Sequence, residues 1–298
     1  MESKSLELGA KPVLKPWFRS RRRIMRIGGR LLLHFVLIVS GFTFLMPLLW
    51  VASTSLKRSG QVFIVPVQWI PTHPQWGNFV EIFKLVPLAR FIGNTLLVSA
   101  LGTLGAVLSS LVVAYSLARL RWPGRDLIFA VLLATMMLPG VVTLIPTFVL
   151  YKNLHWLDTF YPLWVPSFFG GAFNVFLVRQ FMTGLPIDLD EAARIDGAGS
   201  FRILTRVIAP LCGPVLAAVA IFSFLYHYND FMGPLIILSS NDKFTLPLGI
   251  YWLAGRWGNY WHYVMAASMV SITGPIILFF VAQRYFIQGI QLSGLAGR

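Results

Sequence analysis

The sequence predicts an all-α membrane protein. Of its 298 residues, 56% are hydrophobic and only 12% are Asp, Glu, Lys or Arg, whereas soluble domains carry about 25% charged residues. Six runs contain none of these four residues, and each has about the 20 residues that a helix needs to cross a bilayer. Backbone groups in lipid must be hydrogen-bonded within their own segment, so the runs form helices. They are residues 31–56, 91–118, 127–151, 159–178, 207–229 and 257–283.

The chain divides into a polar N-terminal arm, residues 1–30, and a membrane domain, residues 31–290. The connection at 57–90 is predicted to be an ordered loop with a short helix, and residues 119–126 a tight turn around Pro123-Gly124. Residues 239–263 form a connection rich in Trp and Tyr. The expected spans are about 31–56, 91–118, 127–151, 159–182, 207–238 and 262–285.

The third to fifth spans hold glycine and proline at positions that interrupt a helix. Broken membrane helices are tolerated where they face protein or a water-filled cavity, which would place a translocation path here. Small residues also allow ordinary close packing of helices. Both interpretations stay open. The expected interruptions are Pro139-Gly140 and Pro146, then Pro162, Pro166 and Gly170-Gly171, and finally Gly233-Pro234.

The charge distribution predicts the orientation. An even number of spans places both termini on one side, and with that side in the cytoplasm 18 of the 25 Lys and Arg residues are internal. This is the pattern of positive charge that cytoplasmic connections carry. The net charge of +14 therefore indicates membrane orientation and anionic lipid, and no nucleic-acid partner is expected.

A charged stretch, Pro186–Pro210, separates the fourth and fifth spans. Asp188 and Glu191 fit a capping box that starts a helix at about Leu189. Glu191 and Arg194 are three residues apart, so they can pair across one helical turn. The stretch therefore begins with a short capped helix.

The same stretch continues with a second helix. Gly197 and Gly199 permit the backbone that ends the first helix, and Ser200 can cap the helix that leads to Pro210. The small residues Ala192, Ala193 and Ala198 would let another protein approach the backbone closely. The alternative is a charged connector that only keeps a turn in water.

The motif of this stretch resembles the EAA motif of ATP-binding-cassette (ABC) importer permeases, EAA-x3-G-x9-I-x-L-P. It reads Glu191-Ala192-Ala193, three residues, Gly197, nine residues, and then Val207-Ile208-Ala209-Pro210, with apolar Val207 and Ala209 as departures. The resemblance implies the six-helix type I ABC importer permease fold, with a cytoplasmic coupling helix within residues 186–210. By position, the ATPase-coupling residues are Glu191, Ala192, Ala193, Arg194, Asp196 and Gly197.

Other segments are similar to the sugar-transporter branch of that family, which includes the second permease subunit of the maltose importer. They are YHYNDFMGPLIIL at 226–238, with Tyr228 where tryptophan is usual, FTLPLGIYWLAG at 244–255 and FIQGIQLSGLAG at 286–297. The resemblance covers roughly residues 30–298. It implies a bacterial or archaeal inner-membrane complex containing a second homologous permease, two ATPase subunits and an extracytoplasmic solute-binding protein. The ATPase subunits would bind ATP and Mg²⁺, and this chain would hold no cofactor.

Candidate contacts with the binding protein follow from the same resemblance, since the stretch before the last span reaches towards that protein in the family. The alternative is that these aromatic side chains form a belt at the membrane interface. The candidates are Leu248, Tyr251, Trp252 and Trp257.

Candidate residues on the substrate path are the acidic residue of the fifth span with its sequence neighbours, and Asn174 as the equivalent candidate on the fourth span. A charge at mid-bilayer costs about 2.5–3.5 kcal/mol, so such residues usually face a cavity or a partner. Aromatic faces and hydrogen-bonding groups are what a sugar needs. Alternatively, Asn229 and Asp230 only tie a broken helix to its neighbours. The candidates are Asn174, Tyr226, His227, Tyr228, Asn229 and Asp230.

No catalytic or metal site is predicted. The histidines His34, His73, His155 and His262 are scattered, and H-E-x-x-H and cysteine pairs are missing from the sequence. The sequence contains no Gly-Lys dipeptide, so a G-x-x-x-x-G-K-[ST] phosphate loop is absent and the ATPase must be another chain. The expected function is a permease subunit for sugars or oligosaccharides. Rivals are an importer of glycerol phosphate, a self-sufficient channel or secondary transporter, and a membrane enzyme.

Overall fold

The computed structural model describes residues 16–256 and 260–295, which form helices and connections without a β-strand. The chain divides into two compact units, Met1–Ser53 and Thr54–Arg298. The first unit consists of α1 (Pro16–Ser55), which runs on into the second. From Leu31 onwards its apolar side chains are largely exposed, as expected for a helix in lipid.

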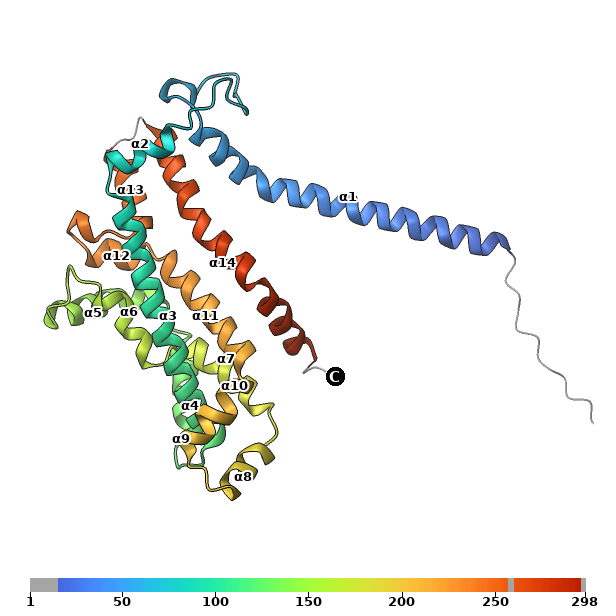
Figure 1. The fold of residues 1–298 in the computed structure, drawn as a ribbon, viewed down its shortest axis with the longest axis vertical. Helices are drawn as coiled ribbons and strands as arrows, with labels where there is room; N and C mark the ends of the chain where they lie inside the picture. Colours follow the sequence, from blue (N-terminus) through green and yellow to red (C-terminus); the bar gives the residue numbers. More distant parts are fainter. Residues whose placement is uncertain (1–15, 257–259, 296–298) are drawn as a thin grey trace, which may run out of the picture. The chain divides into compact units, whose positions relative to one another are not determined.

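The second unit is organised around α3 (Leu88–Arg119). The helix α11 (Gly213–Tyr228) runs beside α3, and α14 (Trp261–Leu295) runs beside α11 (Figure 1). The short helix expected in the 57–90 connection is α2 (Asn78–Leu85). Asn78 Nδ2 donates to the carbonyl oxygens of Ser55 at 2.8 Å and Lys57 at 3.0 Å, which closes this loop. Four helical segments of the described chain are long and apolar enough to cross a membrane: 28–55, 88–119, 161–183 and 261–283.

Two further spans exist only if each of two bent pairs is counted as one. The first pair is α4 (Arg125–Thr135) and α5 (Gly140–Asn153), which meet at 101°. The break lies at Pro139-Gly140, as predicted. Pro146 lies inside α5 and does not end it, so the second predicted interruption was wrong. Membrane helices accommodate such prolines when the freed carbonyl finds another partner.

The fourth predicted span is interrupted at Pro166 and at Gly170-Gly171 as expected, whereas Pro162 lies in the first turn of a helix and interrupts none. The span consists of α6 (Tyr161–Trp164), the 3-10 helix η2 (Val165–Phe169) and α7 (Ala172–Thr183). Gly170 joins η2 to α7 with φ +81°, a value that glycine adopts without a steric penalty.

The fifth predicted span breaks at a different place from the one expected. The helix α12 (Met232–Ile237) includes Gly233-Pro234 in its first turn, and the break lies at residues 229–231. Proline is tolerated in a first turn because the N–H it lacks would be unpaired there. The second bent pair of helical segments meets at 80° beside Cys212, and the sequence analysis did not predict this bend. Pro214 lies in the first turn of the helix that follows Cys212.

The connection between α7 and α11 contains α8 (Asp188–Ile195), α9 (Ser200–Ile203), the π-helix η3 (Leu204–Ile208) and α10 (Ala209–Leu211). The predicted caps were wrong, because the two helices begin at Asp188 and Ser200 and neither has a side-chain cap hydrogen bond. Instead, Asp188, Asp190 and Glu191 occupy the first turn of α8, where carboxylates interact favourably with the helix dipole.

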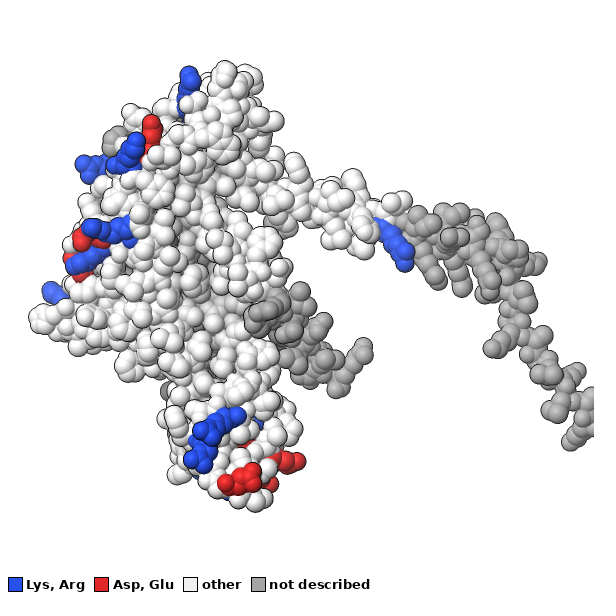
Figure 2. Space-filling model, viewed as in Figure 1, with Lys and Arg blue, Asp and Glu red and all other residues white. Residues whose placement is uncertain are grey.

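Two buried apolar clusters form the core of the second unit, and α3 contributes to both. One joins α2, the first half of α3, α14 and α13 (Leu246–Arg256), a helix that the sequence did not suggest. The other joins the last part of α3 with α7, η3 and α11. Figure 2 shows charged side chains gathered around α8 at one end of this unit, and others towards its opposite end, with an uncharged band between them.

Candidate functional site

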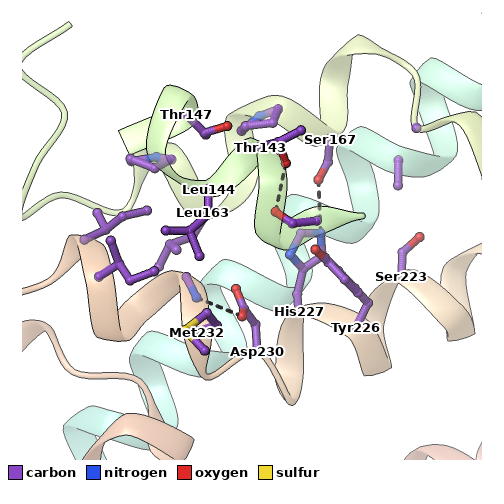
Figure 3. Close-up of a pocket in the computed structure, with 18 of the residues that line it drawn as sticks. Thr143, Leu144, Thr147, Leu163, Ser167, Ser223, Tyr226, His227, Asp230 and Met232 are labelled. Atoms are coloured by element: carbon purple, nitrogen blue, oxygen red, sulfur yellow. Dashed lines mark hydrogen bonds between the residues drawn. The ribbon is translucent and has the colours of Figure 1, made fainter. Parts of the chain in front are cut away.

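The second unit contains a cavity of about 860 Å³. It is lined mainly from α5, α6, η2, α7, α11 and α12, the elements on either side of the helix breaks, and α3 contributes Ala106. Most of its wall is apolar, and Figure 3 shows polar groups from several of these elements facing it. The polar lining residues are Thr143, Thr147, Tyr151, Ser167, Asn174, Ser223, Tyr226, His227 and Asp230.

Hydrogen bonds connect the polar lining across helices. His227 Nε2 lies 3.0 Å from Ser167 Oγ, which joins α11 to η2. Asn174 Nδ2 donates to Ser223 Oγ at 3.2 Å, which joins α7 to α11. Ser109 Oγ on α3 donates to the carbonyl oxygen of Ser167 at 2.8 Å. The cavity wall is thus held in place by neutral hydrogen-bonding groups.

Asp230 is the one charged residue among the described residues that line the cavity, and no Lys or Arg is among them. Its Oδ1 accepts a hydrogen bond from the Gly233 N–H at 3.1 Å, in the first turn of α12 (Figure 3). Asp230 therefore ties the helix break together and also faces the cavity. Its negative charge would attract cations and disfavour anions.

Four of the six predicted substrate-path residues line this cavity: Asn174, Tyr226, His227 and Asp230. The other two do not. Tyr228 is buried and its hydroxyl donates to the carbonyl oxygen of Ser271 on α14 at 2.9 Å. Asn229 Nδ2 donates to the carbonyl oxygen of Leu225 at 2.8 Å, within its own helix end.

Five polar lining residues were missed by the sequence analysis, and Tyr151 and Ser223 are two of them. Thr143 and Thr147 are four residues apart, so they lie on one face of α5, and Ser167 follows Pro166 at a helix interruption. A threonine pair at helical spacing beside a break was the available signal for the first two. Ser167 gave no comparable signal, because its role depends on the approach of His227.

The predicted coupling residues lie together on and just after α8. The side chains of Glu191, Ala192, Arg194 and Asp196 are exposed, as is Gly197, while Ala193 is half-buried against the second core cluster. The Ala198 N–H donates to the Ala193 carbonyl at 2.9 Å, and the Gly197 N–H donates to that of Arg194 at 3.0 Å. This pair of bonds is a Schellman motif.

The predicted binding-protein contacts are distributed differently. Leu248 is buried in the first core cluster, and Trp252 packs against that cluster with the Arg256 guanidinium 5.0 Å from the centre of its ring. Tyr251 is 58% exposed and its ring lies 5.0 Å from that of Phe231. Trp257 lies outside the described residues. Among the candidates that the structure describes, Tyr251 is therefore the one with a largely exposed side chain.

The described part of the chain contains no group of three or more His, Cys, Asp or Glu residues placed to hold a metal ion. Cys212, the single cysteine of the sequence, is fully buried. What the cavity offers chemically is hydrogen bonding, aromatic surface and one negative charge.

Several permease proteins of named transport systems are similar in sequence to this chain. The arabinooligosaccharides transport system permease protein AraQ of Halalkalibacterium halodurans is 36% identical over 246 residues, which cover 82% of this chain and 86% of that protein. The sulfoquinovosyl glycerol transport system permease protein SmoH of Agrobacterium fabrum is 31% identical, covering 88% and 91%. The sn-glycerol-3-phosphate transport system permease protein UgpE of Yersinia pestis is 32% identical, covering 86% and 94%.

A solved structure has the same fold. A chain of a bacterial ABC transporter involved in the import of the acidic polysaccharide alginate superimposes with a TM-score of 0.75 at 24% identity, over 93% of this chain and 100% of that one. Residues 105–291 match the family described as binding-protein-dependent transport system inner membrane component. This chain belongs to the family of inner membrane components of binding-protein-dependent transport systems.

Proposed function

We propose that this chain is a six-span permease subunit of an ATP-driven importer of neutral sugars or oligosaccharides. The observation that carries the proposal is α8, an exposed helix closed by a Schellman motif between two apolar segments. Another protein can bind such a helix without changing its conformation. The family works with a binding protein, so a docking element for further subunits fits the architecture.

Counting each bent pair as one span gives six spans. Both termini then lie in the cytoplasm of a bacterium or archaeon, with 18 of the 25 Lys and Arg residues on that side. This orientation places α8 in the cytoplasm, where ATP is available. The connection that carries α13 and Tyr251 faces the outside, where a solute-binding protein would dock.

The other subunits of the proposed complex would supply what this chain lacks, first of all a site for ATP. Its sequence has no Walker-type phosphate loop, so ATP and Mg²⁺ would be held by two separate ATPase subunits that receive α8. A second permease, similar to this chain, would complete the translocation path. Movement of α8 on closure of the ATPase subunits would expose the cavity alternately to the two sides.

The cavity favours a neutral sugar. Hydroxyl, amide and imidazole groups together with aromatic rings suit sugar hydroxyls and C–H faces, and the arabinooligosaccharide permease is a relative with such a substrate in its name. A glycerol phosphate is the second candidate, because another relative is named for it. Phosphate binding usually requires Arg or Lys, and neither is among the described residues that line the cavity.

Purification of the chain in mild detergent from its native membrane, with sequencing of all co-purifying proteins, tests this proposal. We expect a second permease and an ATPase with a G-x-x-x-x-G-K-[ST] loop. Reconstituted vesicles should then take up sugar only with ATP on the α8 side and with the binding protein on the opposite side. Transport by this chain alone, without ATP, would contradict the proposal and favour a self-sufficient transporter.

A further inference from the structure

A buried ion pair joins α8 to α3. Arg119, the last residue of α3, places Nη1 3.2 Å from Oδ2 of Asp190, and the two side chains are only 3% and 1% exposed. Asp190 is the buried member of the acidic first turn of α8, between exposed neighbours. The inward face of α8 is therefore fixed by a charge pair, while its outward face stays free.

The same arginine also holds the end of α7. Arg119 Nη2 donates to the carbonyl oxygens of Met182 at 2.7 Å and Leu185 at 2.9 Å. These carbonyls belong to the end of α7 and to the connection that leads into α8. A planar guanidinium that bonds several fixed acceptors has little freedom to rotate. Arg119 thus fastens three consecutive parts of the chain to the end of α3.

The helix α3 is suited to carry movement along its length. It has 32 residues without a break or a proline, whereas the segments 125–153, 161–183 and 200–237 are all interrupted and α14 contains Pro275. It also runs through both core clusters. A continuous hydrogen-bonded helix moves as one body, and its rise places Arg119 about 26 Å from Gly102.

The middle of α3 touches the cavity wall. Ser109 Oγ donates to the carbonyl oxygen of Ser167, whose hydroxyl bonds His227. The imidazole of His227 lies against Gly102 and occupies the space that a Cβ would need there. Ala106, between these two positions, lines the cavity itself. A shift of α3 must therefore move polar groups of the cavity wall.

We infer that α3 acts as a rigid helix that transmits a displacement of α8 to the cavity. Arg119 and Asp190 are the positioning residues that fasten α3 to α8. The inference rests on the proposed function only for the source of the displacement. The fastening itself is a property of this chain, and it can be measured whatever partners the chain has.

The fastening is tested by a distance between spin labels in the purified complex in lipid nanodiscs. Cysteines replace Val112 on α3 and Ile195 on α8, which are 54% and 87% exposed, while the native Cys212 is fully buried. We expect a narrow distance distribution that broadens in Arg119→Met. The matched control is Arg121→Met, an exposed arginine two residues further on, which should leave the distribution narrow. An unchanged distribution in Arg119→Met would overturn the inference.

The transmission is tested by the ratio of solute imported to ATP hydrolysed in the same complex. We expect Arg119→Met to lower this ratio at least about ten-fold while the subunits still co-purify, and Arg121→Met to keep it. Because Arg119→Met leaves Asp190 as a buried unpaired charge, it could fail to fold. The double variant Arg119→Met/Asp190→Leu removes both charges and avoids this problem. A double variant with normal import per ATP would overturn the role of the pair, and a low ratio would support it.

Discussion

Gly197 is a residue whose identity is dictated by the backbone. Its φ is +77° and the space around a Cβ at this position is empty within 4 Å. The sequence predicted that glycine ends α8 here, and the Schellman bonds account for it. Since the subunit itself leaves room for a side chain, the remaining constraint is conformational, or comes from whatever docks on α8.

Replacing Gly197 by alanine should therefore weaken the end of α8. A non-glycine residue in the left-handed region costs about 1–2 kcal/mol, so we expect lower ATP-dependent uptake with the protein still inserted in the membrane. Gly199→Ala is the matched control, because Gly199 has φ −72° and equally open surroundings. Equal uptake by the two variants would show that the turn at Gly197 has no role in coupling.

Asp158 fastens two connections that are far apart in the sequence. Its Oδ1 accepts hydrogen bonds from the N–H groups of Ser239 and Ser240, both at 3.0 Å, and its Oδ2 lies 3.0 Å from Lys243 Nζ. Burial acts to raise the pKa of Asp158, but the hydrogen bonds from Ser240, Ser239 and Lys243 outweigh it and hold the pKa well below its ordinary value of 3.8.

This pKa shift predicts a loss of stability in acid. Because the folded-state pKa is the lower one, the contacts stabilise the fold above about pH 4, and the stabilisation disappears as the pH falls below that value. We expect the melting temperature of the solubilised protein to fall between pH 5 and pH 3 by about 2–4 °C more than in Asp158→Asn. The same acid dependence in both proteins would assign it to other carboxylates.

At the level of elements, the contact between α3 and α11 depends on the absence of a side chain at Gly102. The imidazole of His227 fills the space that a Cβ would need, and its partner Ser167 comes from η2. Three elements therefore meet at one glycine. The sequence marked His227 as a candidate for the path but gave no reason to single out Gly102.

Gly102→Ala should separate these elements. Overpacking of a filled site usually costs about 1–3 kcal/mol, so we expect a lower melting temperature and an altered cavity. Gly93→Ala on the same helix is the control, because nothing lies within 4 Å of its Cβ position; alanine there should be neutral or stabilise by about 0.5–1 kcal/mol. If Gly102→Ala melts at the same temperature as Gly93→Ala, then His227 can move away from α3 without loss of stability.

At the level of the whole molecule, the charge of the cavity bears on which solutes the complex can carry. Asp230 contributes the one charge among the described lining residues. We expect neutral oligosaccharides to compete for uptake by the reconstituted complex, and sugar phosphates to compete at least about ten-fold less well. Strong competition by a sugar phosphate would place its binding groups in another subunit or favour the glycerol phosphate alternative.

Asp230→Asn refines this test. The asparagine Oδ1 can still accept the hydrogen bond from Gly233, so the start of α12 should persist while the charge is removed. We expect uptake of neutral sugar to continue and discrimination against sugar phosphate to decrease. Unchanged discrimination in this variant would mean that Asp230 acts only as a tie at the helix break.

The sequence by itself determined the helical membrane class, the site of α8 and the family. Apolar runs and the EAA-like spacing are local properties, and lipid allows a spanning segment little choice but to be a helix. The sequence also placed the breaks near Pro139 and Gly170, because glycine and proline act on their own backbone.

Only the tertiary structure decided which side chains share the cavity and what fastens α8. Tyr228 and Asn229 are neighbours of His227 in the sequence, yet the geometry of the helix turns their side chains away from the cavity that His227 lines. Arg119 and Asp190 are 71 positions apart, and their contact depends on how α3, α7 and α8 are placed in the folded chain. Such meetings depend on distance in space, which residue type and local spacing do not encode.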